Sequence, residues 1–117
     1  MSPKIVQHYS TNDLELSLDA VSGSRYWSVA LSKAMLTYFK VPPRARFEEH
    51  AHDSEQITYV LAGTLVFEVG GREYEVGAGE VIAVPGNVPH AVFALDREVE
   101  AVDAWAPPRN IASRAVK

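Results

Sequence analysis

The sequence predicts an all-β protein, built as a barrel or a jelly roll. In residues 57–76, ITYVLAGTLVFEVGGREYEV, apolar and polar residues alternate, and the run is interrupted by Ala62-Gly63 and by Gly70-Gly71. Alternation of period two is typical of strands with one buried face, and the glycines supply the positive φ that tight hairpins require. Short apolar runs bounded by glycine, proline and asparagine continue to residue 106, and nothing in the middle of the chain has helical periodicity.

The other elements follow in chain order. Near the amino terminus, the leucines of NDLELSL alternate with acidic residues and serine, which favours a short strand or an extended arm over a helix. Residues 26–41 are rich in aromatic and β-branched residues and end at VPPR. They predict one or two strands, because proline cannot donate to a sheet ladder. Residues 77–95 and 98–106 predict further short strands, separated by turn-forming residues.

Length and composition limit the domain count and the class of function. The 117 residues, 12.9 kDa, fit one domain, which we divide into an arm or edge strand at 1–20, a barrel at 21–110 and a tail at 111–117. The net charge is -4 and the basic residues are scattered, so we expect no nucleic-acid partner. The sequence has neither a signal-peptide core nor an apolar run of membrane-spanning length, which predicts a cytoplasmic protein without a membrane partner.

The chain contains four histidines and no cysteine, so a metal would need nitrogen and oxygen ligands. His50 and His52 stand at i and i+2, and on a strand they would share one face. Gln56 follows across the bend DSE, which returns the chain toward the same point, and His90 arrives from a separate segment, PGNVPH. The sequence therefore predicts one metal site formed by His50, His52, Gln56 and His90.

Two alternatives stay open for these residues. The two neighbouring histidines also suit a solvated pair beside acidic residues, with His90 as a core or loop histidine. Glu55 is a second candidate for the oxygen ligand, but adjacent strand residues face opposite sides, which favours Gln56.

These spacings resemble the cupin family. The family's first motif falls on His50, His52, Gln56 and Gly63, and the second falls on Gly79, Pro85 and His90. The resemblance extends from about Tyr38 to Trp105 and implies an RmlC-like jelly-roll β-barrel. It also implies one divalent metal ion, for which imidazole and amide ligands suit Zn, Ni, Fe or Mn.

The chain departs from the family motifs at four positions. Asn87 replaces a glycine, and it tolerates the positive φ that such a glycine supplies. Arg44 replaces another glycine and Ala94 an asparagine, from which we expect relaxed turn constraints. Gln56 replaces a glutamate, so that three imidazoles and a neutral amide would leave the ion its full charge. That charge favours polarising a carbonyl or binding an anionic substrate over redox work.

A third stretch, AVDAWAPPRNIA, points to the substrate. Asp103 and Trp105 share one face of a predicted strand, and Arg109 follows the pair Pro107-Pro108. Alone, this pattern also fits an edge-strand aspartate, a core tryptophan and a solvated arginine. It is similar, however, to the carboxyl end of the cupins of pectin and alginate breakdown, which convert 4,5-unsaturated uronates to linear keto sugars. The resemblance implies that Arg109 binds the substrate carboxylate, Asp103 is the general acid/base and Trp105 is a wall for the sugar ring.

The resemblance leaves three other functions open. They are a dioxygenase-like oxidoreductase using Fe or Mn, a non-catalytic module that binds a metal or small ligand, and a polyketide cyclase-like enzyme with an apolar substrate channel. Because cupins commonly exchange or pack amino-terminal arms, the exposed LELSL segment also predicts a homodimer.

Overall fold

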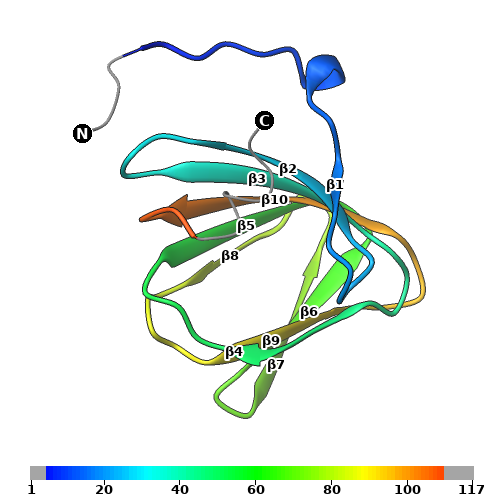
Figure 1. Cartoon of the computed structure of the whole chain (residues 1–117). Helices are drawn as coiled ribbons and strands as arrows, with labels where there is room; N and C mark the ends of the chain where they lie inside the picture. The colour runs from blue at the N-terminus through cyan, green and yellow to red at the C-terminus, as the bar shows by residue number, and fades with distance from the viewer. Residues whose placement is uncertain (1–4, 110–117) are drawn as a thin grey trace.

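A computed structural model describes residues 5–109, and in this range ten strands form two antiparallel sheets (Figure 1). Residues 5–10 form no regular element and lead into a 3-10 turn, Thr11–Asp13. The side chain of Ser10 caps the start of this turn. The strands are β1 (Ser17–Leu18), β2 (Arg25–Ala30), β3 (Met35–Val41), β4 (Arg46–His50), β5 (Glu55–Ala62), β6 (Thr64–Val69), β7 (Arg72–Gly77), β8 (Val81–Val84), β9 (His90–Ala94) and β10 (Val99–Ala106).

The two sheets face each other and enclose the interior. One sheet has the strand order β1-β2-β3-β10-β5-β8, and the other has the order β4-β9-β6-β7. Consecutive strands repeatedly cross from one sheet to the other, as β3 to β4 and β9 to β10 do. The prediction of an all-β jelly roll is confirmed, and within residues 5–109 no helix is long and apolar enough to cross a membrane.

The core lies between the sheets because each strand buries alternate side chains. In β10 the inward residues are Val99, Ala101, Asp103 and Trp105, and their neighbours point outward. The apolar core of the described residues consists of Tyr26, Met35, Phe39, Val41, Val60, Leu65, Phe67, Val76, Val84, Val92, Ala94, Val99, Ala101 and Trp105. Asp103 is therefore a polar residue in an otherwise apolar row, on a central strand and not at an edge.

The hairpins lie where the sequence predicts them. Residues 26–41 form two strands, β2 and β3, and the glycines of both later turns have positive φ. At Gly63, φ is 78° and an added Cβ would lie 2.5 Å from the carbonyl oxygen of Glu98, so this turn requires glycine. The arm is joined to the sheet through β1, which pairs with β2. The predicted tail, the last barrel residue and residues 1–4 of the arm lie outside the described residues.

The expectation of a relaxed turn at Arg44 is wrong. Arg44 has φ 64° and Asn87 has φ 63°, so both retain the left-handed conformation in which the family motifs carry glycine. Asparagine adopts this conformation readily, whereas arginine does so at a cost in backbone energy. The Arg44 amide donates to the Leu95 carbonyl at 2.7 Å, which fixes the turn before β4.

Candidate metal centre and active site

Three histidines meet at one end of the barrel interior. His50 ends β4 and His90 begins β9, and the two are direct partners in the ladder between these strands. His52 lies two residues beyond β4, so it is placed by a loop and not, as expected, by the strand. The turn before β9 holds that loop in place, because the backbone N–H of Asn87 donates to the His52 carbonyl at 2.7 Å.

The three rings point at a common centre. Their centroids are 4.5 Å apart for His50 and His90, 5.0 Å for His52 and His90, and 5.5 Å for His50 and His52. One ligand nitrogen from each ring lies within 4.8 Å of the other two. Ligands on one ion are ~3–4 Å apart when each bond is ~2.1 Å, so small ring rotations would complete the site.

Backbone carbonyls fix which ring nitrogen faces the centre. Each Nδ1–H donates to a carbonyl two residues away: His50 to Glu48 at 2.7 Å, His52 to Ser54 at 2.9 Å and His90 to Val88 at 2.8 Å. A proton on Nδ1 leaves the lone pair on Nε2, the atom left for a metal. The Nε2 of His90 is buried and has no hydrogen-bond partner, which a coordinated cation would explain.

Gln56 offers an oxygen atom to the candidate site. It is buried on the inward face of β5, whereas Glu55 is exposed on the outward face. The Gln56 amide Nε2 donates to Thr58 Oγ1 at 3.0 Å, which turns Oε1 to within 3.1 Å of His52 Nε2. Two acceptor atoms then face each other, the arrangement that a shared cation stabilises. His50, His52, Gln56 and His90 thus fit a divalent ion.

Asp103 is connected to this centre through Thr58. The Thr58 hydroxyl accepts from Gln56 and donates to Asp103 Oδ1 at 2.5 Å. Burial raises the pKa of Asp103 from 3.8 to about 7, although the hydrogen bond from Thr58 and the charge of Arg109 both act to lower it. A carboxyl with a pKa near neutrality both holds and releases a proton under physiological conditions, which suits a general acid/base.

Trp105 and Arg109 close the same side of the site. The Trp105 indole Nε1–H donates to Thr37 Oγ1 at 3.0 Å, and its ring contacts that of His52 edge-on, with 5.5 Å between centroids. The Arg109 guanidinium lies over the indole, 4.9 Å from the ring centroid. The segment that carries Arg109 is tied down, because the Ser54 hydroxyl donates to the Pro107 carbonyl.

Burial and positive charge also act on the histidines. The pKa of His52 is lowered mainly by burial and then by the charge of Arg109, and the pKa of His90 is lowered mainly by burial. Both rings are therefore neutral at physiological pH, the form that binds metals.

The site opens into a cavity of about 400 Å³, large enough for a small organic molecule. Its lining is mixed in polarity. Next to the candidate metal centre the polar lining residues are His50, Gln56, Thr58, His90, Asp103 and Arg109, and Asp19, Arg46 and Glu48 also line the cavity. The apolar part of the lining includes Phe39, Val41, Phe47, Leu65, Phe67, Val92 and Ala101. The cavity therefore suits a ligand that carries both polar and apolar groups.

Thr58 is the functional residue that the sequence analysis missed. It lies two residues after Gln56 on the same face of β5, so strand parity alone would have placed it in the interior. Nothing in the local sequence indicates its bond to Asp103, because that contact joins residues 45 positions apart.

Comparison with known proteins agrees with this architecture. A family model described as the cupin domain matches residues 37–105, more than half of the chain. The chain belongs to the cupin domain family.

Two solved structures share this fold, and one curated relative is similar over part of its sequence. The structure of KdgF from Halomonas sp. has a TM-score of 0.82 at 20% identity, covering 92% of this chain and 98% of its own. The polyketide cyclase RemF from Streptomyces resistomycificus has a TM-score of 0.77 at 22% identity, covering 91% and 82%. An acireductone dioxygenase from Ciona intestinalis is 29% identical over 77% of this cupin and 54% of its own length. The chain thus spans about half of that curated relative.

Proposed function

We propose that this cupin is a metal-dependent enzyme that moves a proton on a small anionic substrate, and that the substrate is a 4,5-unsaturated uronate opened to a linear keto sugar. The observation that carries the proposal is the position of Asp103. A buried carboxyl with a pKa of about 7 is joined through one hydroxyl to a residue of the metal centre, and both line the same cavity.

Arg109 would bind the substrate carboxylate. It lies at the cavity wall beside Asp103 and His52, where its positive charge opposes the rise in the pKa of Asp103 that burial causes and adds to the lowering of the pKa of His52 by burial. A guanidinium forms a planar two-point contact with a carboxylate. Stacking on the Trp105 ring would keep the Arg109 guanidinium in one orientation for that contact. A divalent ion held by the three histidines and Gln56 would act as a Lewis acid toward a sugar oxygen.

Asp103 would carry the proton. In the ring form of the substrate, loss of the proton from the anomeric hydroxyl forms the C1 carbonyl and breaks the bond between C1 and the ring oxygen. The ring oxygen becomes an enolate oxygen on C5, and a proton returned to C4 gives the C5 ketone. One proton leaves and one returns, so the conversion is an isomerisation that needs no oxidant. A group with a pKa near neutrality suits both transfers.

A dioxygenase is the second candidate, and the named acireductone dioxygenase relative favours it. That reaction would use the same cavity but would consume O2. Oxygen dependence therefore separates the two candidates.

The deciding experiment is a substrate screen on the full chain loaded in turn with Zn, Ni, Fe and Mn. Loss of the conjugated double bond of unsaturated galacturonate is followed by absorbance, with and without O2. We expect equal rates in air and under anaerobic conditions. Loss of activity without O2, or O2 uptake with an acireductone, would favour the dioxygenase. Turnover of an aromatic polyketide substrate but no uronate would assign the apolar part of the cavity to a cyclase.

A further inference from the structure

The side chains that face the barrel interior form rows across each sheet, and the rows become apolar with distance from the metal centre. On the six-stranded sheet, Gln56 and Trp105 are ladder partners in the row at the metal centre. Two residues along each strand, Thr58 and Asp103 are partners in the next row. The row after that consists of Phe39, Ala101 and Val60. On this sheet the polar rows therefore end at Asp103.

The facing sheet becomes apolar one row sooner. His50 and His90 are partners at the metal centre, and the next row consists of Phe47, Val92 and Phe67. Asp103 therefore shares the cavity with an apolar wall. We call the part of the cavity lined by Phe39, Phe47, Leu65, Phe67, Val92 and Ala101 the apolar chamber.

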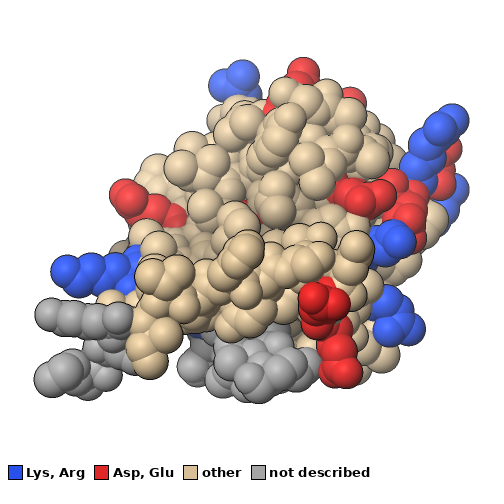
Figure 2. All heavy atoms as spheres, turned by 90° about the horizontal axis from the view of Figure 1, so that it is seen from above, with Lys and Arg blue, Asp and Glu red and all other residues tan. Residues whose placement is uncertain are grey.

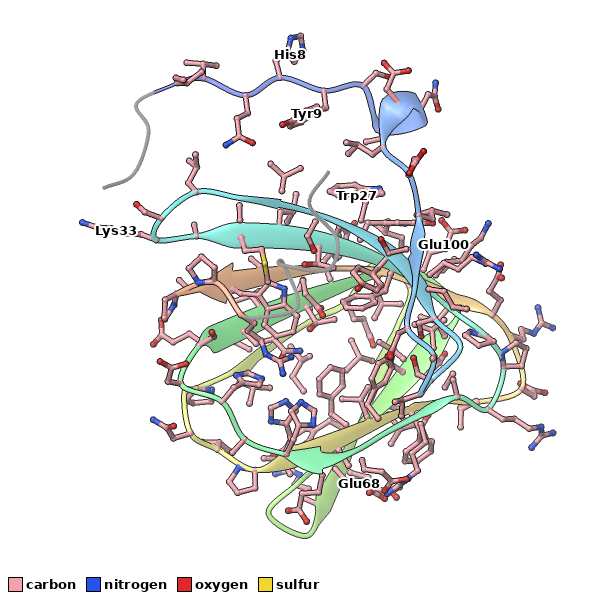
Figure 3. The ribbon with its side chains drawn as sticks, in the orientation of Figure 1. His8, Tyr9, Trp27, Lys33, Glu68 and Glu100 are labelled. Carbon is pink, nitrogen blue, oxygen red and sulfur yellow. The ribbon has the colours of Figure 1, made fainter. Side chains whose placement is uncertain are left out.

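Charged side chains gather around the border of the molecule in the view from above (Figure 2), and those at the exposed edge of the cavity are paired with other groups. The Asp19 carboxylate accepts from the backbone N–H of Val21 at 3.2 Å. Arg46 and Glu48, 42% and 76% exposed, form an ion pair at 3.3 Å. The second partner of Arg46 is Glu68, at 2.9 Å, on the outer side of the four-stranded sheet (Figure 3). These pairs leave the chamber to apolar contacts.

Ala101 has the smallest side chain in the inward row of β10, which it shares with Val99, Asp103 and Trp105. It is 2% exposed and lines the cavity. Protein interiors are close-packed, with few voids larger than a water molecule. A cavity of about 400 Å³ is therefore a binding space, and the methyl group of Ala101 leaves part of that space open one row beyond Asp103.

We propose that the apolar chamber binds an apolar substituent of the substrate, and that Ala101 limits the size of this substituent. The identity of the parent sugar rests on the proposed function. In that reaction C1 needs a free hydroxyl, C4 and C5 carry the double bond, and the C6 carboxylate binds Arg109. The substituent is therefore an ester or ether of the hydroxyl on C2 or C3. Its burial strengthens binding about fourfold for each methylene group.

The test uses straight-chain carboxylates from acetate to octanoate as probes, titrated calorimetrically into the zinc-loaded full chain. The carboxylate matches the cationic end of the cavity, and the alkyl chain enters the chamber. We expect the dissociation constant to fall about fourfold per methylene group until the chamber is full. Ala101→Leu adds three carbon atoms to the wall, so octanoate should bind at least ~10-fold more weakly while acetate binds within about threefold of the wild type.

The matched control is Ala104→Leu, the same substitution on the opposite face of β10. Ala104 is exposed, and its ladder partners Leu36 and Ile57 are 44% and 50% exposed. Figure 2 shows no charged side chain over the middle of this outer face, which is thus a second apolar surface for alkyl chains. Ala104→Leu should bind octanoate like the wild type. Tighter binding by this variant, with unchanged binding by folded Ala101→Leu, would overturn the proposal.

Circular dichroism and bound zinc report whether each variant is folded, and Ala101→Val is a milder change if Ala101→Leu does not fold. A wild-type dissociation constant that does not change with chain length would overturn the proposal without any variant. This series does not depend on turnover. Failure to consume the unsubstituted uronate would instead refute the proposed function.

The preferred substrate is tested with the 2-O- and 3-O-butanoyl esters of unsaturated galacturonate. For one of them, kcat/KM should exceed that of the parent sugar at least ~10-fold, and Ala101→Leu should abolish this preference. An active enzyme that prefers neither ester would contradict the assignment of the chamber to a substituent of the sugar.

Discussion

Replacing Thr58 with valine would test whether one hydroxyl orients Gln56, the candidate oxygen ligand. Valine has nearly the shape of threonine, so the packing of β5 is kept while both hydrogen bonds of the hydroxyl are lost. Thr58 is 1% exposed, so water cannot replace those bonds without a local rearrangement. The Gln56 amide would then be free to turn its nitrogen, in place of its oxygen, toward His52.

The structure indicates the size of the effects. Two buried polar atoms, Gln56 Nε2 and Asp103 Oδ1, lose their partner, and each costs ~1–3 kcal/mol. The free energy of unfolding of the metal-free protein should therefore fall by about 2–6 kcal/mol. Loss of a residue that orients a metal ligand typically weakens metal binding about 10- to 100-fold.

The pH profile gives a third readout. The hydrogen bond from Thr58 acts to lower the pKa of Asp103, so its removal should raise that pKa further above its ordinary value. The limb of the activity profile that reports Asp103 should move to higher pH.

Thr37→Val is the matched control. Thr37 is equally buried, lies opposite Asp103 on the other neighbouring strand, and accepts from Trp105 Nε1. It should lose comparable stability and keep metal affinity within about threefold. Metal affinity is measured by competition titration with a chelating dye, and stability by urea unfolding. Equal metal affinity for Thr58→Val and the wild type would refute the orienting role of Thr58.

Four further predictions concern the site. Replacing His50 and His52 together with alanine should abolish metal binding while β-type circular dichroism is retained, and unchanged metal content by elemental analysis would contradict the ligand assignment. Asp103→Asn should lower the turnover number ~10²- to 10⁴-fold with metal retained, and full activity would exclude Asp103 as the proton carrier. Because the folded pKa of Asp103, about 7, lies above 3.8, its contribution to stability is complete below pH 3.8 and lost as pH rises to about 7. Urea unfolding of the metal-free protein should show this loss, up to about 4 kcal/mol, and the asparagine variant should not. Arg109→Lys keeps the positive charge but loses the planar, two-point hydrogen bonding of the guanidinium, so KM should rise more than kcat falls. A larger fall in kcat than rise in KM would mean that Arg109 acts in the chemical step.

Much of the site was predictable because strand parity is a local property. The choice of Gln56 over Glu55, and the inward position of Asp103 and Trp105, follow from alternation along a single strand. The hairpin glycines were predictable for the same reason, since a tight turn is decided by the few residues within it.

The sequence by itself predicted the all-β fold, the inward position of Gln56, Asp103 and Trp105, and the candidate metal-ligand residues. Only the tertiary structure decided which residues meet: His50 opposite His90, and Thr58 opposite Asp103. These pairs join distant segments, and their register depends on how all the connections close the barrel. Local patterns specify where a side chain points, whereas the pairing of strands specifies what it meets.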